Sequence, residues 1–513
     1  MNPAARRKAL AAASGALLAL SFPKFGQGAV AWVALAPLLT ALHGATPFEG
    51  LMLGYLTGAV SALGLLYWTA LVVVQYGGLS LPVGLAVMGL LCLAFAIFPL
   101  LFGGLVAMWS ERLGPGALII APLAWTATEI LRAHTFFQFP WCLLGYSQHA
   151  NLPVIQIAAY TAVYGVSFVV ALVSGLLAYV AVVPARGVPA LLALLGLVVV
   201  LYVQGGVALE TPLAERGRLR VGLVQAGILQ EDKWRPEKAS ANIERHIELT
   251  RRAAAAGARL VVWPESAAPF YFDDVPRLAE ELRQLVRRER VYLFFGNDDH
   301  EAGEGGERIY VGAKMLDPEG ALTLRYRKMQ LVPFGEYVPL QPLLTLGGRQ
   351  AAKLVRQVSD FTPGREAAIG EVDGHRLGGF ICYEAVFPAL VRRFSAGGAE
   401  LLVNITNDAW YGRSSAPYQH LAMAAFRAVE NGKYLVRAAN TGITAVVDPR
   451  GRILERSELF AQGVLVRDVP LVAGQTFYAR HGDVFGWGCL GASLALSGSL
   501  LRRPHLRGRA RSA

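Results

Sequence analysis

A cysteine and a glutamate stand two residues apart in the stretch Gly-Gly-Phe-Ile-Cys-Tyr-Glu-Ala-Val-Phe-Pro, which runs from Gly378 to Pro388. The apolar residues before Cys382 predict the end of a buried strand, the glycines predict a tight turn beside a reacting group, and Pro388 predicts an early end to regular structure. A thiol at such a strand end can act as a nucleophile. Free cysteines are also among the most buried residues, so a plain core cysteine is the competing interpretation.

Two further strand ends carry groups that a cysteine nucleophile needs. Glu265 stands in Trp-Pro-Glu-Ser, and Lys328 stands in Tyr-Arg-Lys-Met. A carboxylate can accept the thiol proton, and a nearby ammonium group can stabilise the oxyanion of a tetrahedral intermediate. Singly, Glu265 is better explained as a surface ion-pair carboxylate and Lys328 as a solvated lysine. Their joint placement with Cys382 beside glycine and proline turns favours an active site.

The chain around these residues is too apolar for a soluble protein. It has 513 residues, of which 54% are hydrophobic and 17% charged, and its mean hydropathy is +0.41. Apolar runs fill the chain up to about Gly206, are absent from a long middle segment, and return between Val484 and Leu501. This pattern predicts a membrane α-helical bundle of about eight transmembrane helices and a soluble α/β domain inserted before the last of them.

The predicted domain organisation follows from these runs. Residues 1–210 form an N-terminal transmembrane bundle of about seven helices, 218–482 the soluble domain, 484–501 a C-terminal transmembrane helix and 502–513 a basic tail. A second apolar stretch follows the first almost at once, so the N-terminus is interpreted as membrane spans and not as a cleaved signal peptide. The first candidate span ends at about residue 22. The others lie at about 28–42, 51–74, 82–108, 115–131, 153–183, 189–209 and 484–501.

The four cysteines indicate no disulfide framework. Three of them, Cys92, Cys142 and Cys489, lie in or next to apolar runs. Cys382 is therefore the only thiol of the soluble segment.

Basic residues in the short connections predict the orientation of the bundle. With a cytoplasmic N-terminus, the inside loops hold more arginine and lysine than the outside loops, as the positive-inside rule requires. The soluble domain then lies outside and the tail lies in the cytoplasm. This topology accounts for part of the net charge of +11, and nucleic-acid binding is disfavoured because no stacking aromatics accompany the basic tail. The inside residues are Arg6, Arg7, Lys8, Arg112, Arg186 and the tail arginines, and the outside ones are Lys24 and Arg132.

Two features follow the fifth predicted span. Residues 135–151 are rich in aromatic side chains, and we expect them at the membrane interface, as an anchoring belt or as a lip that binds lipid. Glu129 and Arg132 are expected to pair with each other. Other charges within the predicted spans are too few for a proton or substrate pathway, which argues against a transporter.

The soluble segment alternates strand-like and helix-like pieces, which predicts layered α/β packing with active groups at strand ends. The loops at 273–276 and 340–360 are candidate lids because of their glycine, proline and apolar content. The predicted strands are 219–225, 259–265, 291–296, 309–316, 322–328, 377–382, 401–406, 434–438 and 444–447, and the predicted helices are 236–256, 278–288 and 417–433.

The motifs around the three candidate residues carry a resemblance to known families. Trp-Pro-Glu at Glu265, Lys328, Cys-Tyr-Glu at Cys382 and Asn-Ile-Thr-Asn-Asp-Ala-Trp from Asn404 resemble the carbon-nitrogen hydrolase (nitrilase) superfamily with its Glu-Lys-Cys triad. Together with the predicted membrane spans, Leu-Val-Pro-Phe-Gly-Glu-Tyr-Val-Pro from Leu331 and the run Ala-Pro-Tyr-Gln-His resemble the bacterial apolipoprotein N-acyltransferases. This resemblance covers nearly the whole chain.

The resemblance implies a nitrilase-like αββα sandwich on the periplasmic side of the bacterial inner membrane. In it, Cys382 would take an acyl chain from a phospholipid as a thioester, Glu265 would transfer protons, and Lys328 would stabilise the oxyanion. The α-amine of an S-diacylglyceryl cysteine at a lipoprotein N-terminus would then accept the chain, which is the last step of lipoprotein maturation. The resemblance also implies four supporting site residues, Glu336, Tyr383, Glu384 and Trp234.

The supporting residues have expected roles of their own. Glu336 and Glu384 would hold Lys328 and tune the field of the cleft, and Tyr383 would shape the acyl site. No metal or nucleotide cofactor is expected, because the nine histidines show no ligand spacing and no glycine-rich phosphate loop follows a strand. His420, near a helix start, is interpreted as structural.

Two other classes of function stay open at this point. A membrane-anchored nitrilase-type amidase could use the same triad on a small amide, although it would not require seven spans or the exclusion of water. A membrane scaffold or channel would leave Cys382 as a core residue. Replacement of Cys382 by serine separates the catalytic classes from the scaffold.

Overall fold

The computed structural model describes residues 2–135, 138–233, 235–303, 306–337 and 361–502. Trp234, the predicted lid at 340–360 and nearly all of the predicted tail lie outside these residues. The described chain divides into two compact units. The sandwich unit comprises Thr211–Arg480 with the short piece Gln75–Gly78, and the helical unit comprises the rest.

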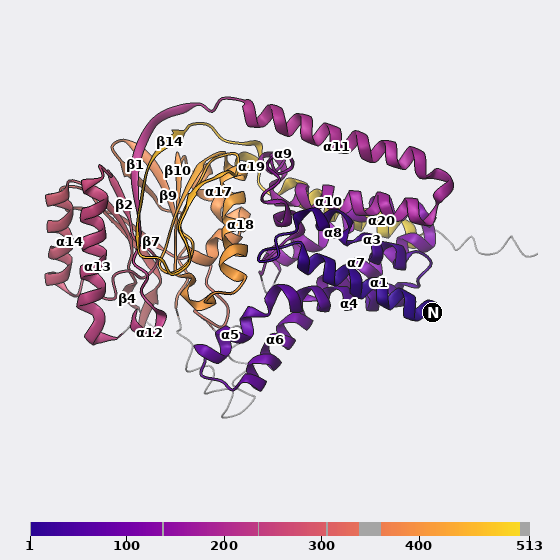
Figure 1. The fold of residues 1–513 in the computed structure, drawn as a ribbon, viewed down its shortest axis with the longest axis horizontal. Helices are drawn as coiled ribbons and strands as arrows, with labels where there is room; N and C mark the ends of the chain where they lie inside the picture. The colour runs from indigo at the N-terminus through magenta and orange to yellow at the C-terminus, as the bar shows by residue number, and fades with distance from the viewer. Residues whose placement is uncertain (1, 136–137, 234, 304–305, 338–360, 503–513) are drawn as a thin grey trace, which may run out of the picture. The chain divides into compact units, whose positions relative to one another are not determined.

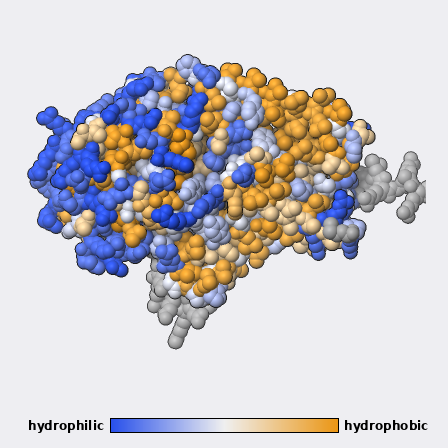
Figure 2. Space-filling view, viewed as in Figure 1, coloured by the Kyte–Doolittle hydropathy of each residue, from blue (hydrophilic) through white to orange (hydrophobic). Residues whose placement is uncertain are grey.

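The helical unit contains apolar helices long enough to cross a membrane. Five described stretches meet that criterion, and one of them, Leu81–His134, holds three consecutive helices. The predicted membrane bundle is therefore confirmed, while the number of eight spans stays a prediction. Figure 2 shows hydrophobic residues over the exposed side of α11. The helices are α1 (Pro3–Leu20), α2 (Ala31–Ala34), α3 (Ala36–Leu42), α4 (Pro47–Leu66), α5 (Trp68–Gln75), α6 (Leu81–Phe95), α7 (Ile97–Leu113), α8 (Ala117–His134), α9 (Leu152–Ile155), α10 (Ala158–Val182), α11 (Gly187–Glu210) and α20 (Val484–Arg502).

Small residues set the closest helix packing of this unit. Gly50, Gly54 and Gly58 lie four residues apart on α4 and face α7. A side chain at Gly54 would overlap the main-chain carbonyl of Pro99, which cannot move away as a flexible side chain could. Because lipid supplies no hydrophobic driving force between helices, such close backbone approach is a main source of their association.

Glu129 and Arg132 attract each other electrostatically, as expected, but their hydrogen bonds go to other groups. Glu129 accepts hydrogen bonds from the Nε1 of Trp125 at 3.0 Å and the amide of Leu144 at 2.7 Å, whereas Arg132 donates to the carbonyl of Trp141 at 3.2 Å. Both charges thus bind the segment that follows α8. Trp141 is only 1% exposed, so its side chain lies inside the unit and does not form part of an interfacial belt. For the segment as a whole, a place at the membrane interface stays a prediction.

The sandwich unit contains two six-stranded sheets. The first has the order β14-β1-β2-β3-β6-β7 and the second β13-β12-β11-β10-β9-β8. In each sheet three neighbouring strands run parallel and the others antiparallel. The strands of the first sheet are β1 (Glu215–Gln225), β2 (Leu260–Val262), β3 (Tyr292–Gly296), β6 (Gly312–Leu316), β7 (Leu322–Arg327) and β14 (Gly463–Val472). Those of the second are β8 (Ile369–Val372), β9 (His375–Ile381), β10 (Leu401–Thr406), β11 (Tyr434–Ala439), β12 (Ala445–Val447) and β13 (Ile453–Arg456).

Helices cover the outer face of each sheet, which gives the predicted αββα layers (Figure 1). The helices α13 (Pro236–Ala255) and α14 (Pro276–Glu289) lie on the first sheet, and α17 (Pro388–Ala396) and α18 (Ala416–Asn431) lie on the second. Apolar side chains of both sheets form one core, to which Phe294 of β3 contributes. Burial of the apolar faces stabilises this stacking at about 25 cal/mol per Å².

Most predicted strands are present, but two differences stand out. The predicted strand 309–316 is divided between β6 and β5 (Gly306–Tyr310), which pairs instead with β4 (Asp299–Gly303) as a separate hairpin. The strand β14 was not predicted, yet it pairs antiparallel along β1. Asp468 and Pro470 interrupt its apolar pattern, and an edge strand tolerates both residues because one side of it needs no partner.

Candidate active site

Cys382 directly follows β9 and begins the short 3-10 helix η5 (Cys382–Val386). Its φ angle is +50°, in the left-handed region that residues other than glycine rarely occupy. The expected role of the glycines is wrong, because Gly379 lies within β9, where a side chain would overlap Phe294 of the other sheet. Pro388 begins α17 instead of ending regular structure. Cys382 itself therefore makes the turn, and the glycine lets the two sheets approach.

Groups from the second sheet and α18 hold this strained turn. The Nε2 of His420 lies 3.1 Å from the carbonyl oxygen of Cys382, and its Nδ1 lies 3.0 Å from the Oδ1 of Asp408. Arg437 donates to the other oxygen of Asp408 at 2.7 Å. His420 thus contacts the backbone of Cys382, which agrees with its interpretation as a structural residue.

Glu265 is separated from the end of β2 by Trp263 and Pro264, and it is 7% exposed. One carboxylate oxygen accepts the amide of Asn407 at 2.8 Å, and the other lies 3.1 Å from the Nζ of Lys328. The next residue, Ser266, has a φ angle of +46°. Glu265 therefore also sits beside a left-handed turn, with its carboxylate fixed from both sheets.

Lys328 follows β7 and is fully buried between two carboxylates. Its Nζ lies 3.1 Å from Glu265 and 2.6 Å from Glu336. Burial opposes the charge of Lys328, but the two carboxylates outweigh burial and raise its pKa well above the ordinary value. Lys328 thus stays an ammonium group, and Glu336 is held in turn by the amide of Val332 at 2.8 Å.

Glu384 lies on the other side of the turn at Cys382. Its Oε2 accepts the amide of Ile381 at 2.7 Å, and its Oε1 accepts the hydroxyl of Tyr326 at 2.7 Å and the amide of Met329 at 2.6 Å. It therefore ties the turn at Cys382 to the segment that carries Lys328. Burial raises the pKa of Glu384 to about 7, while these donors favour the carboxylate.

The thiol of Cys382 is protonated at rest. Burial and the negative charge of Glu265 raise the pKa of Cys382, whereas Lys328 and a hydrogen bond with Thr406 act in the opposite direction. This differs from cysteines whose thiolate is preformed by a neighbouring cation. The arrangement favours removal of the proton by a base only when a substrate is in place.

Comparisons with known proteins agree with this geometry. A model of the carbon-nitrogen hydrolase family matches residues 220–478, and a model of the apolipoprotein N-acyltransferase N-terminal domain matches residues 14–176. The apolipoprotein N-acyltransferase of Geobacter metallireducens is 43% identical over 507 residues, which are 96% of this chain and 95% of that protein. The chain belongs to the apolipoprotein N-acyltransferase family. The relative from Methylococcus capsulatus is 34% identical over the same shares of both chains.

Some solved structures are similar to about half of this member of the apolipoprotein N-acyltransferase family. An amidase of Nesterenkonia from the nitrilase superfamily is 23% identical and covers 54% of this chain and 98% of its own, with a TM-score of 0.39.

Two predicted site residues of this family member remain, Tyr383 and Trp234, and the structure describes only the first. Tyr383 is buried, and its ring packs edge-on against Phe387 with the centroids 5.0 Å apart. Trp234 lies outside the described residues, so its role stays a prediction. Among the described residues, no cluster of histidine, cysteine and acidic side chains has the geometry of a metal site.

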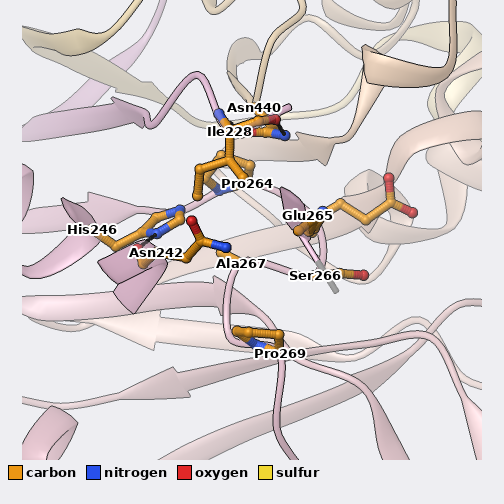
Figure 3. Close-up of a pocket in the computed structure, with 10 residues that line it drawn as sticks. Ile228, Asn242, His246, Pro264, Glu265, Ser266, Ala267, Pro269 and Asn440 are labelled. Carbon is orange, nitrogen blue, oxygen red and sulfur yellow. Dashed lines mark hydrogen bonds between the residues drawn. The ribbon is translucent and has the colours of Figure 1, made fainter. Parts of the chain in front are cut away.

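A small cavity lies behind the main chain of Glu265 (Figure 3). Its volume is about 10 Å³, and its lining includes Asn242 and His246 of α13 and Asn440. The Glu265 carboxylate points away from the other residues drawn. A cavity of this size holds one water molecule at most, so it is no acyl site.

Sequence analysis missed several residues that position the site. Lys233, Asp408 and Arg437 were not singled out, although each is buried and contacts a main-chain or side-chain group of the site. Asn407 and Asp408 were noticed only as parts of the motif that begins at Asn404. In the sequence, Asp408 and Arg437 appear only as charged residues near apolar strand residues. Such a charge can be buried or lie at the surface, and the sequence alone does not distinguish the two.

Proposed function

We propose that this protein is an apolipoprotein N-acyltransferase that moves an acyl chain from a phospholipid to the α-amine of an S-diacylglyceryl cysteine. The observation that supports it most is the pair of contacts from the Nζ of Lys328 to Glu265 and Glu336 beside the turn of Cys382. Membership of the family and the apolar helices support a lipid substrate. Glu265, Lys328 and Cys382 each follow a strand of the sandwich, so their relative positions are fixed before substrate binds.

In the first half-reaction, the thiol of Cys382 attacks the ester carbonyl carbon of the phospholipid, and its proton passes to the carboxylate of Glu265. The developing oxyanion is stabilised by the ammonium group of Lys328. The tetrahedral intermediate then collapses as the bond to the lysophospholipid oxygen breaks. That oxygen takes the proton from Glu265, and a thioester remains on Cys382.

In the second half-reaction, the α-amine of the diacylglyceryl cysteine attacks the thioester carbonyl. Glu265 accepts a proton from the amine, and Lys328 again faces the oxyanion. The carbon–sulfur bond breaks, an amide forms, and the thiol recovers its proton from Glu265. An amine is a better nucleophile than water toward a thioester, and hydrolysis is suppressed where water is excluded.

Glu336 and Glu384 have supporting roles in this proposal. Glu336 keeps Lys328 charged and oriented toward Glu265. Glu384 holds the Cys382 turn and the Lys328 segment in one geometry. Tyr383, next to the nucleophile, would border the bound acyl chain, and Trp234 is proposed as a further site residue from the family resemblance alone.

Intact mass measurement of the purified protein with a diacyl phospholipid tests the first half-reaction. We expect an increment of one acyl chain that hydroxylamine removes, and none in the Cys382→Ala variant. Addition of a diacylglyceryl lipopeptide should discharge the adduct and yield an N-acylated peptide. Absence of the adduct, together with turnover of a small amide by the same preparation, would support an anchored amidase instead.

We propose further that the protein lies in the bacterial inner membrane with the sandwich unit in the periplasm and the C-terminus in the cytoplasm. The arginines near both ends of the chain support this orientation. A fluorescent reporter that matures only in the cytoplasm, fused to the C-terminus, should be bright. A dark fusion that is present at normal abundance would contradict the orientation.

A further inference from the structure

A second buried lysine lies beside the proposed base and has no part in the reaction described so far. Lys233 ends the short helix α12 (Gln230–Lys233) and is 5% exposed. Its Nζ donates to the main-chain carbonyl of Glu265 at 2.8 Å. A buried ammonium group is costly unless it is paired, so its position beside Glu265 calls for a reason.

The carbonyl that Lys233 binds belongs to a constrained turn. Ser266 follows it in the left-handed region, and Gly296 of the neighbouring strand packs so closely that a side chain there would overlap Glu265. The amide of Gly296 donates to the carbonyl of Pro264 at 3.2 Å. The hydrogen bond from Lys233 to the carbonyl of Glu265 is charge-assisted, and such bonds are stronger than those between neutral groups.

The same short segment also reaches the carboxylate of Glu265. The side-chain amide of Asn407 donates to Gln230 at 2.8 Å, while the main-chain amide of Asn407 donates to the Oε2 of Glu265 at 2.8 Å. Asn440 joins this chain by donating to Asn407 at 3.1 Å. Residues 230–233 thus hold both the backbone and the acidic group of the proposed base.

The charges around the thiol give Lys233 an electrostatic role as well. Lys328 is shared by two carboxylates, Glu265 and Glu336, so it is not a dedicated partner of Glu265. Burial lowers the pKa of Lys233 to about 8, against the opposing influence of Glu265, Asp298 and Cys382. Negative charge moves to the sulfur when Cys382 loses its proton, and to the substrate oxygen when the oxyanion forms. A second cation nearby stabilises this charge.

We propose that Lys233 is a positioning residue for the transfer reaction, which fixes Glu265 through its carbonyl and supplies the second positive charge that the deprotonation of Cys382 requires. This inference rests on the proposed role of Glu265 as the base. Besides Glu265, Asp298 and Cys382, the titratable group that faces Lys233 is His246 of α13, whose pKa burial lowers to about 4 and which is therefore neutral near pH 7.

The chain offers a matched control. Lys433 is 2% exposed and donates to the carbonyls of Val472 and Gly474, and burial lowers its pKa to about 8 as well. Lys233→Met and Lys433→Met therefore remove the same kind of buried, carbonyl-bound charge. Only the first removes it next to Glu265.

The test is the rate at which iodoacetamide alkylates Cys382 in the full-length protein in detergent, followed by peptide mass between pH 6 and 10. We expect Lys233→Met to slow alkylation near pH 7.5 by about tenfold, which corresponds to one unit in the thiol pKa. The alkylation rate of Lys433→Met should stay within about twofold of the rate of the natural protein, even if this variant is less stable to heat. Lys233→Arg should recover most of the rate.

Equal alkylation in Lys233→Met and the natural protein would overturn the proposal, and so would equal losses in both methionine variants. Alkylation needs no phospholipid, so absence of a thioester in the natural protein would count against the proposed function and not against this inference. If Lys233→Met fails to fold, the pH profile of Lys233→Arg decides. An unchanged profile of that variant above pH 8 would overturn the electrostatic part.

Discussion

In the helical unit, Glu129 and Arg132 bind main-chain groups of the segment after α8, whereas in the sandwich unit Lys328 binds the carboxylates of Glu265 and Glu336. Both regions bury charge, and burial is costly in both. In the first, each charge satisfies a backbone group that packing would otherwise leave unpaired. In the sandwich unit, the ammonium group of Lys328 holds two carboxylates close together. Carboxylates in such a cluster are able to exchange protons. The partner of a buried charge thus separates an architectural role from a chemical one.

Replacement of Lys328 by methionine tests this comparison with the largest expected effect. Two carboxylates would then face each other without a cation, and the oxyanion would lose its partner. We expect thioester formation to fall by at least about 1000-fold in single-turnover mass measurements.

Lys314→Met is the matched control for that variant. Lys314 lies in β6 of the same sheet, is also buried, and donates to Asn297 at 2.7 Å. Its loss should lower thermal stability and leave the rate within about threefold. Equal losses of activity in the two variants would remove the distinction between a chemical and an architectural lysine.

Glu384 gives a second, smaller effect because it holds the site without facing the substrate. Glu384→Gln would turn an NH₂ group toward donors from Ile381, Tyr326 and Met329. We expect a loss of about 1–3 kcal/mol in stability, typical of a disrupted buried hydrogen-bond group. The rate of thioester formation should fall by about 10- to 100-fold. A stable variant with full activity would show that the turn at Cys382 does not depend on this carboxylate.

The pH dependence sharpens the role of Lys233. Its pKa is lowered to about 8 by burial, so the side chain is charged below pH 8 and loses its proton as the pH rises. We expect the rate of thioester formation to decline above pH 8 in the natural protein. The decline should persist in Lys433→Met, and it should move to higher pH in Lys233→Arg because a guanidinium group stays protonated. An identical decline in the arginine variant would assign it to another group.

Glu129→Gln in the helical unit should have the smallest effect on chemistry. The amide would present a donor to Leu144 in one of its two orientations and would no longer offer charged acceptors to Trp125 and Leu144. We expect lower thermal stability of the purified protein, by a few degrees, and alkylation of Cys382 within about twofold of the natural rate. A large loss of Cys382 reactivity in this stable variant would contradict an architectural role for the buried charges of the helical unit.

Most of the sandwich was predictable because its strands are short apolar runs bounded by glycine and proline. The strands that ended at Glu265, Lys328 and Cys382 were placed within a few residues of β2, β7 and β9. The strand β14 and the break between β5 and β6 were not, because pairing between distant segments decides whether a mixed sequence becomes a strand.

The sequence by itself determined the division into apolar and mixed segments, the layered α/β architecture and the residue types of the candidate site. These depend on local patterns, and the chain carries such patterns continuously. Only the tertiary structure decided that His420 and Glu384 hold the turn at Cys382 and that Glu129 and Arg132 bind backbone groups. The partner of a buried charge is chosen by which strand ends and loops meet in space, and sequence separation carries no information about that distance.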